Sequence, residues 1–197
     1  MDAFTVHTGH AVPLRRSDVD TDQIIPSDWL KRVQRTGFGA GLFAEWRQQK
    51  GFVLDRPEYA GASILLAGVN FGTGSSREHA VWALQDHGFR VIVSERFGDI
   101  FRNNAHKGGL LAVQLDATEV EALMAATEQE PSVDVTVDLV AREIRYLNRV
   151  VGFDLDDYTR DRMLAGLDDI SLTLQHDSDI AGYEQRRLPW LPTAAPV

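Results

Sequence analysis

The chain contains no cysteine among its 197 residues. It therefore cannot form a disulfide, use a cysteine nucleophile, or supply thiolate ligands to zinc or to an iron–sulfur cluster. Any such cluster that takes part in its chemistry must be held by a partner chain.

Long apolar runs and basic stripes are missing as well. The longest apolar runs are shorter than ten residues, and the first residues do not show a basic segment followed by an apolar one. We therefore expect neither a membrane span nor a secretory signal, and we predict a cytoplasmic protein. The 29 acidic residues outnumber the 20 basic ones, which are scattered, and the formal net charge is −9. This balance disfavours general nucleic-acid binding, so an anion would have to be attracted by local groups.

The composition that remains fits one α/β domain. With 44% hydrophobic residues, the chain can bury one sizeable core. We predict a single domain over residues 1–197, with a core to about residue 155, a helical extension over 156–188 and a loose tail over 189–197. Strand and helix patterns alternate in the middle of the chain, whereas residues 132–151 alternate with period two. These patterns favour an α/β sandwich of mixed strand direction over a purely parallel doubly wound sheet.

Three weaker patterns complete the expected structure. Residues 3–12 are typical of a strand or hairpin, and residues 168–188 of one helix with a polar middle. His106 is expected on the surface or at a helix end, because no second ligand stands at helical spacing to make it a metal ligand.

The stretch at residues 63–87 organises the chain. It opens with an apolar run without polar alternation, which indicates a strand covered on both faces. Gly72 and Gly74 then favour a loop with uncovered backbone amides. Ser75 and Glu78 follow the Ser-x-x-Glu pattern of a capping box and predict that a helix begins at Ser75.

This arrangement predicts an anion site at residues 75–77. Ser75 and Ser76 would lie where unpaired amides and the positive end of the helix meet, and Arg77 would add a guanidinium.

Two upstream segments leave alternatives open. The acidic segment at residues 15–26 is either a solvated turn or a loop whose Asp20 and Asp22 hold a cation or orient a catalytic group. Residues 27–38 combine basic and apolar side chains. They are either a short amphipathic helix with a solvated basic face or a mobile loop that presents a cation beside an apolar patch.

Four motifs together resemble one family. They are VDTDQIIP at 19–26, WLKR at 29–32, GTGSSREHA at 72–80 and NNAHKGGLL at 103–111. In this order they resemble the swivelling domain of the aconitase family, in the form of the small subunits of 3-isopropylmalate dehydratase. The resemblance covers nearly the whole chain and weakens beyond about residue 155. Thr73 stands where many relatives carry a cysteine, which keeps a small side chain.

The resemblance implies a swivelling β/β/α domain that acts as half of a hydro-lyase. The reaction would interconvert 2-isopropylmalate and 3-isopropylmalate by dehydration and rehydration in leucine biosynthesis. It would take place in a heterodimer whose large subunit holds a [4Fe–4S] cluster, and this chain itself would hold no metal. The same resemblance extends to small subunits of homoaconitase or of citramalate-type hydro-lyases. A phosphate-binding module is a distant alternative, because the glycine loop lacks the Gly-Lys-Ser/Thr ending of a P-loop. A scaffold role is another.

Residue roles are implied by the same resemblance. Ser75 would act as the base in its alkoxide form, Arg77 would bind a substrate carboxylate, and Asp22 would orient the base or a partner residue. The other implied residues fall into a substrate-binding set, Ser76, Lys31, Thr21 and Arg32, and a specificity loop with Leu30, Val33, Thr36 and Gly37.

Overall fold

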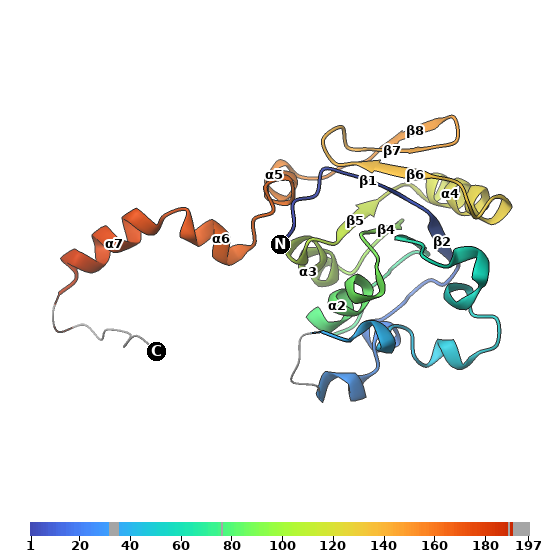
Figure 1. Ribbon diagram of the computed structural model, residues 1–197, viewed down its shortest axis with the longest axis horizontal. Coiled ribbons are helices and arrows are strands. Elements are labelled where there is room, and N and C mark those ends of the chain that lie inside the picture. The colour runs from blue at the N-terminus through green and yellow to red at the C-terminus, as the bar shows by residue number, and fades with distance from the viewer. Residues whose placement is uncertain (32–35, 76, 189, 191–197) are drawn as a thin grey trace.

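The computed structural model describes residues 1–31, 36–75, 77–188 and 190. Within these residues the chain forms two four-stranded sheets with flanking helices and a helical C-terminal arm (Figure 1). The strands are β1 (Val6–Gly9), β2 (Ala11–Leu14), β3 (Ile64–Ala67), β4 (Val91–Ser94), β5 (Leu111–Gln114), β6 (Val135–Asp138), β7 (Glu143–Tyr146) and β8 (Arg149–Gly152). The α-helices are α1 (Thr21–Ile24), α2 (Glu78–His87), α3 (Asp99–Gly108), α4 (Ala117–Gln129), α5 (Asp157–Ala165), α6 (Asp169–Leu174) and α7 (Asp177–Arg186). Short 3₁₀ helices span Ser27–Lys31, Gly39–Gly41, Trp46–Gln48, Val53–Asp55 and Pro57–Tyr59. None of the described helices combines the length and the apolar character that crossing a membrane requires.

Strands β2, β3, β4 and β5 form a parallel sheet in that order. Every residue of β2, β3 and β4 is buried, which confirms the covered strand predicted near the start of residues 63–87. One face packs against α2, α3 and residues 38–62, and the other packs against α4 and the second sheet. Because the strands are parallel, the loops that follow them gather at one edge of the sheet, where α/β proteins commonly place their sites.

The second sheet is antiparallel, with the order β1-β6-β7-β8. Buried and partly exposed residues alternate along β6 and β7, so the period-two pattern predicted within residues 132–151 is confirmed there, whereas β8 has no buried residue. The prediction of mixed strand direction is confirmed too: one sheet is parallel throughout and the other is antiparallel throughout. The alternative of a hairpin in residues 3–12 is wrong, because β1 pairs with β6 whereas β2 pairs with β3. The chain changes sheets at His10, whose carbonyl accepts from the amides of Ser63 and Ile64.

His106 is buried, contrary to the expectation of a surface or capping position. Only 8% of the residue is exposed. Its Nε2–H donates to the carbonyl of Ala112, at 3.1 Å, and so ties α3 to β5. Burial lowers the pKa of His106 below its usual value, and the nearby Arg102 adds to this lowering, while the bond to Ala112 acts in the opposite direction.

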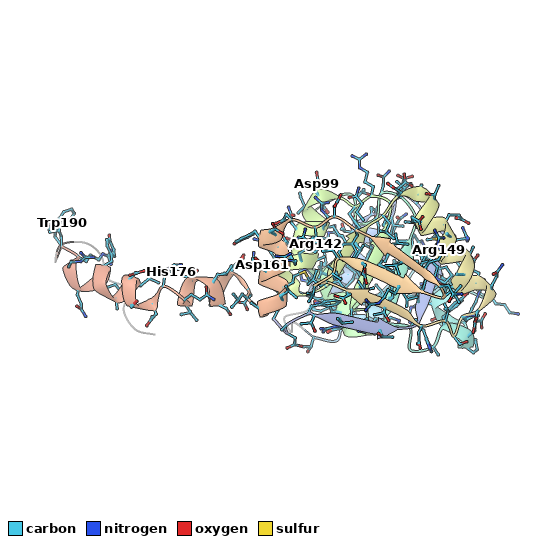
Figure 2. The ribbon with its side chains drawn as sticks, turned by 90° about the horizontal axis from the view of Figure 1, so that it is seen from above. Asp99, Arg142, Arg149, Asp161, His176 and Trp190 are labelled. Atoms are coloured by element: carbon cyan, nitrogen blue, oxygen red, sulfur yellow. The ribbon has the colours of Figure 1, made fainter. Side chains whose placement is uncertain are left out.

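The C-terminal helices differ in how they contact the body of the molecule, which consists of the two sheets and the helices α1 to α4 that flank them. Helix α5 packs on it through the buried Met163, whose carbonyl accepts from the Phe4 amide at 2.9 Å. Helices α6 and α7 lead away from the body as an arm (Figures 1 and 2). The expected single helix at residues 168–188 is two helices, because His176 leaves the helical conformation with φ −103° and ψ 21°.

Candidate functional site

Two loops meet at the carboxyl edge of the parallel sheet, one after β2 and one after β3. The amides of Gly72 and Thr73 donate to the Val19 carbonyl at 2.7 and 3.1 Å, and the Thr21 amide donates to the Thr73 carbonyl at 3.0 Å. These bonds extend the pairing of the sheet beyond its strands. The Asp-Thr-Asp motif and the glycine loop lie far apart in the sequence and were both predicted to be functional. These bonds make them adjacent in space.

Thr21 holds Ser75 in place. The Thr21 hydroxyl donates to the Ser75 carbonyl at 2.7 Å, and Thr21 is only 2% exposed. A buried hydroxyl with a backbone partner is costly to displace. Contact between Thr21 and a substrate stays a prediction; in the structure this hydroxyl serves to fix the backbone of Ser75, which is itself exposed.

Asp22 and Arg77 form an ion pair across the two loops, with Arg77 Nη1 donating to Asp22 Oδ1. Asp22 lies in α1, which is held by a capping box: Asp20 accepts from the Gln23 amide at 2.8 Å, and Gln23 Oε1 accepts from the Asp20 amide at 3.0 Å. Asp20 is thus a helix cap, whereas the carboxylate of Asp22 faces the arginine.

The capping box predicted from Ser75 and Glu78 is wrong. Helix α2 begins at Glu78, and Arg77 is its N-cap residue in an extended conformation, with φ −140° and ψ 112°. The physical reason is that Gly72, Thr73 and Ser75 are hydrogen-bonded to the loop after β2, while the guanidinium of Arg77 reaches Asp22. Ser75 therefore lies outside the first turn of α2.

Glycines allow the loop to approach its neighbours. Gly72 has φ +76°, and a Cβ there would lie 2.2 Å from Cγ of Phe101. Gly74 has φ +87° and faces Asp20. The sequence reasoning missed Gly98, in the loop after β4, where a Cβ would lie 2.4 Å from the Gly72 carbonyl oxygen. The Phe-Gly pair that follows the third apolar strand was the available signal.

Several residues predicted to bind the substrate or to set specificity follow the Asp-Thr-Asp motif in the sequence. Leu30 and Lys31 lie in the 3₁₀ helix Ser27–Lys31, which contains no buried residue. Lys31 Nζ pairs with Asp28 Oδ1 at 3.0 Å, and the Lys31 side chain is 81% exposed. Thr36 and Gly37 are exposed. Three further predicted site residues, Ser76, Arg32 and Val33, lie outside the described residues.

The described residues contain no group of three or more His, Cys, Asp and Glu side chains that could hold a metal ion. The sequence offers no cysteine for an iron–sulfur cluster either. What the site presents is a hydroxyl, a guanidinium and a carboxylate. This set can bind a carboxylate and move a proton, but it holds no Lewis acid of its own.

Comparisons with known proteins agree over the full length of the chain. Residues 1–118 match the family model of the aconitase C-terminal domain, and residues 169–196 match the model of the C-terminal domain of the 3-isopropylmalate dehydratase small subunit. The chain is 68% identical over 193 residues to the 3-isopropylmalate dehydratase small subunit of Acidothermus cellulolyticus, and the aligned residues cover 98% of each chain. It is 58% identical over 197 residues to that of Streptomyces coelicolor, which covers 100% of each.

A solved structure supports the fold. The crystal structure of a 3-isopropylmalate dehydratase from Methanocaldococcus jannaschii superposes with a TM-score of 0.69 over 90% of this chain and 98% of that one, at 24% sequence identity. The two-sheet architecture is thus shared with a protein whose sequence has diverged widely.

Proposed function

The chain belongs to the family of 3-isopropylmalate dehydratase small subunits, and from this membership and the geometry of the site we propose how it works. It is the small subunit of a hydro-lyase that interconverts 2-isopropylmalate and 3-isopropylmalate in leucine biosynthesis. In our proposal it acts in the cytoplasm as a heterodimer with a large subunit. The observation that supports this most directly is the pairing of the Asp-Thr-Asp loop with the glycine loop, which sets Ser75 beside an Asp22–Arg77 pair.

The reaction removes a proton from carbon and a hydroxide from the neighbouring carbon, and then returns water in the other orientation. Ser75 is the proposed base, because its exposed side chain extends from a backbone that Thr21 fixes. A serine base needs a defined position and nearby positive charge to exist as an alkoxide. Arg77, two residues further on, supplies a positive charge that α2 cannot supply at Ser75 itself.

Arg77 is the proposed carboxylate-binding group. Its guanidinium carries five N–H donors in a planar fork, and the bond to Asp22 uses one edge of it. The remaining donors can bind a substrate carboxylate through two parallel hydrogen bonds, a geometry that lysine cannot reproduce. Asp22 orients the fork and balances its charge before substrate arrives.

Substrate choice falls to the segment that includes Leu30, Lys31, Thr36 and Gly37, together with Arg32 and Val33. Besides Arg77, one more cation is proposed to reach the substrate. Lys31 is our first candidate for it and Arg32 the alternative, while Leu30 and Val33 would contact the isopropyl group. Ser76 would donate a hydrogen bond to the substrate or to the base. Because each methyl-sized contact is worth about 1 kcal/mol, discrimination by these side chains should be modest.

The departing hydroxide needs a Lewis acid, which in this proposal is the [4Fe–4S] cluster of the large subunit. This chain has no cysteine to hold such a cluster, so its residues fit the role of a domain that closes over a site built elsewhere.

The test is reconstitution. The purified chain should show no turnover of isopropylmalate alone and should recover it when the large subunit is added anaerobically. Ser75→Ala should lower kcat by about 10²–10⁴-fold, the usual contribution of a general base. Ser132→Ala, which removes another exposed hydroxyl, is the matched control. Turnover by the chain alone, or unchanged kcat in Ser75→Ala, would overturn the proposal, and the second result would favour a scaffold role.

A further inference from the structure

The C-terminal arm, defined as α6 and α7, exposes apolar side chains that its own body does not cover. Ile170 is 72% exposed and Tyr183 60% exposed, and Leu174 and Ile180 are exposed with them. Ile170 and Leu174 lie one turn apart in α6, as Ile180 and Tyr183 do in α7. Figure 2 shows the arm leading away from the body towards Trp190. Helices this short are marginal in water unless an apolar side is covered by packing.

The root of the arm is fixed to the body. Lys107 Nζ and Arg162 Nη2 bind the two carboxylate oxygens of Asp169 at 2.9 and 2.7 Å. The chain's amino terminus lies 3.5 Å from Oδ2 of Asp168. Hydrogen bonds from Ser171 and, to a smaller extent, the charge of the amino terminus together lower the pKa of Asp168 to about 2, so this carboxylate stays charged near neutral pH. The arm therefore leaves the body from an anchored base.

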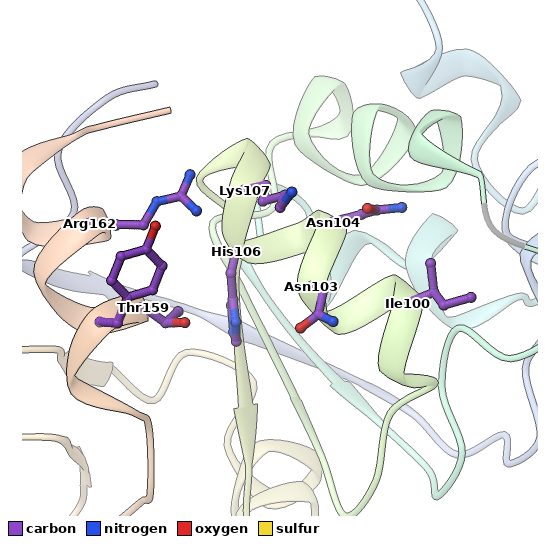
Figure 3. A pocket seen from close by; sticks show the side chains of 8 residues that line it. Ile100, Asn103, Asn104, His106, Lys107, Thr159 and Arg162 are labelled. Carbon is purple, nitrogen blue, oxygen red and sulfur yellow. The ribbon is translucent and has the colours of Figure 1, made fainter. Parts of the chain in front are cut away.

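The surface between the arm and the candidate site is continuous. A cavity of about 380 Å³ between α3 and α5 is lined by Lys107 and Arg162 at the arm root, by Tyr158, and by Ile100 at the other end of α3 (Figure 3). A second hollow of about 470 Å³ joins Ile170 to Glu78, the residue after Arg77. The arm root and the candidate site thus share one face of the molecule.

This face must meet the chain that completes the site. Under the proposed function, a Lewis acid held by the large subunit must come close to Ser75 and Arg77. A partner that covers these residues lies at one end of the shared face, and the exposed apolar side chains of the arm continue from the other end.

Charge favours a different chain over a second copy of this one. Residues 168–190 contain five acidic and two basic side chains, and the whole chain has a net charge of −9. Two such arms would repel each other, and the acidic body offers no compensating surplus of basic groups. A partner surface suited to the arm is an apolar groove with a basic rim.

We propose that α6 and α7 form a docking arm that inserts Ile170, Leu174, Ile180 and Tyr183 into an apolar, basic-rimmed groove on the large subunit. This inference rests on the proposed function. A domain joined covalently to the rest of its enzyme needs no such device, whereas a separate subunit that must open and close is retained by an arm that stays bound while the domain moves. Residues 169–196 accordingly match a model specific to small subunits and lie beyond the aconitase-like residues 1–118.

The test uses the full chain and the purified large subunit. The variant Ile180→Ala with Tyr183→Ala removes exposed apolar surface from α7 and keeps a strong helix former at both positions. We expect the Kd for the large subunit, measured by calorimetry, to rise at least tenfold, because exposed tyrosines often become dominant contacts when an interface forms. The kcat at saturating large subunit should stay within twofold, since the arm lies away from Ser75. The matched control is Val140→Ala with Val150→Ala, two side chains 60% and 63% exposed on the antiparallel sheet and its turn, which should leave Kd unchanged.

Other results would overturn the docking arm. An unchanged Kd in the arm variant would do so, and so would a lower kcat at saturation with unchanged Kd. A wild-type dimer in sedimentation that becomes monomeric in the arm variant would assign the arm to self-association. Failure of the wild-type chain to bind the large subunit would overturn both proposals, whereas failure of the arm variant to differ from wild type would leave the proposed function standing.

The proposed basic rim of the groove on the large subunit can be tested separately, through the salt dependence of binding. Asp177→Asn with Asp179→Asn removes two charges from the first turn of α7. If the rim is basic, the affinity of the wild-type chain falls as salt is added, and the affinity of this variant falls less steeply. Equal salt dependence would overturn the basic rim.

Discussion

The paired loops that carry Thr21 and Ser75 and the segment that carries Lys31 both belong to the candidate site, but the chain holds them differently. Backbone hydrogen bonds join the loops to each other, and Thr21 is buried between them. The segment Ser27–Lys31 is a 3₁₀ helix without a buried residue. The groups proposed to move the proton are therefore positioned by the sheet, whereas Lys31, proposed to bind the substrate, is largely exposed and Leu30 is half-buried. Changes in the loops should affect stability and kcat, and changes in the segment should affect KM.

The largest effect is expected from Gly72→Ala. The added Cβ would meet the Phe101 ring, and the alanine would have to keep φ at +76°. We expect a loss of about 2–4 kcal/mol in the free energy of unfolding, from the left-handed conformation together with overpacking. Thermal or urea unfolding measures it. Gly182→Ala, whose Cβ would meet nothing within 4 Å, is the control and should be neutral or stabilising by up to about 1 kcal/mol. Equal stability of the two variants would show that the loops are not tightly held.

The next effect concerns the ion pair. Arg77→Lys keeps the charge but loses the planar fork, so kcat/KM of the reconstituted enzyme should fall about 10- to 100-fold, the value of one or two charge-assisted hydrogen bonds. Asp22→Asn should lower kcat/KM by a smaller factor, because it loosens the orientation of Arg77 but keeps the guanidinium in the site. Arg56→Lys, an exposed arginine in another loop, controls for the substitution itself. Activity of Arg77→Lys equal to wild type would exclude bidentate binding by this residue.

Patterns repeated along neighbouring residues were enough to predict most of the body. The unbroken apolar run near residues 64–67 indicated a covered strand, and the period of two after residue 132 indicated half-covered strands in a hairpin or small meander, because each depends only on which face of a strand is buried. The start of α2 was mispredicted for the opposite reason. A local Ser-x-x-Glu pattern competed with a bond from Arg77 to a residue 55 positions away, and the distant bond prevailed.

The site shows the same division. The resemblance brought Ser75, Arg77 and Asp22 together, and the structure places them on adjoining loops, although their roles stay predictions. The use of the Thr21 hydroxyl was invisible in the sequence, because it depends on a carbonyl 54 residues away. The burial of His106 was missed similarly, since nothing near it in the sequence shows that β5 will lie against its ring.

His106 gives a smaller effect, on stability and its pH dependence. Its pKa in the folded chain is below the usual 6.5, mainly because burial disfavours the charged ring. Between the folded and unfolded pKa values the unfolded chain binds more protons, so the contribution of neutral His106 is complete above about pH 6.5 and is lost as the pH falls below it. His7 and His87 shift in the same direction and add to the loss.

The measurement is urea unfolding as a function of pH for wild type and His106→Gln. A glutamine amide can still donate to the Ala112 carbonyl but does not titrate, so the decline in stability below pH 6.5 should become shallower. An unchanged slope would contradict a buried, neutral His106.

The smallest effect on stability, and the sharpest test of the comparison between loops and segment, is expected from Lys31→Met. Its ion pair with Asp28 joins two largely exposed side chains, a class of interaction worth between 0 and about 1 kcal/mol, so the unfolding free energy should change by less than about 0.5 kcal/mol. The reconstituted enzyme should nevertheless show KM raised several-fold with kcat little altered, because a cation that binds ground state and transition state equally affects KM alone. Lys50→Met, which removes an exposed lysine from another loop, should change neither constant. If Lys31→Met instead lowered kcat as strongly as Arg77→Lys, Lys31 would have to stabilise the transition state, and the division between loops proposed for catalysis and a segment proposed for substrate binding would not hold.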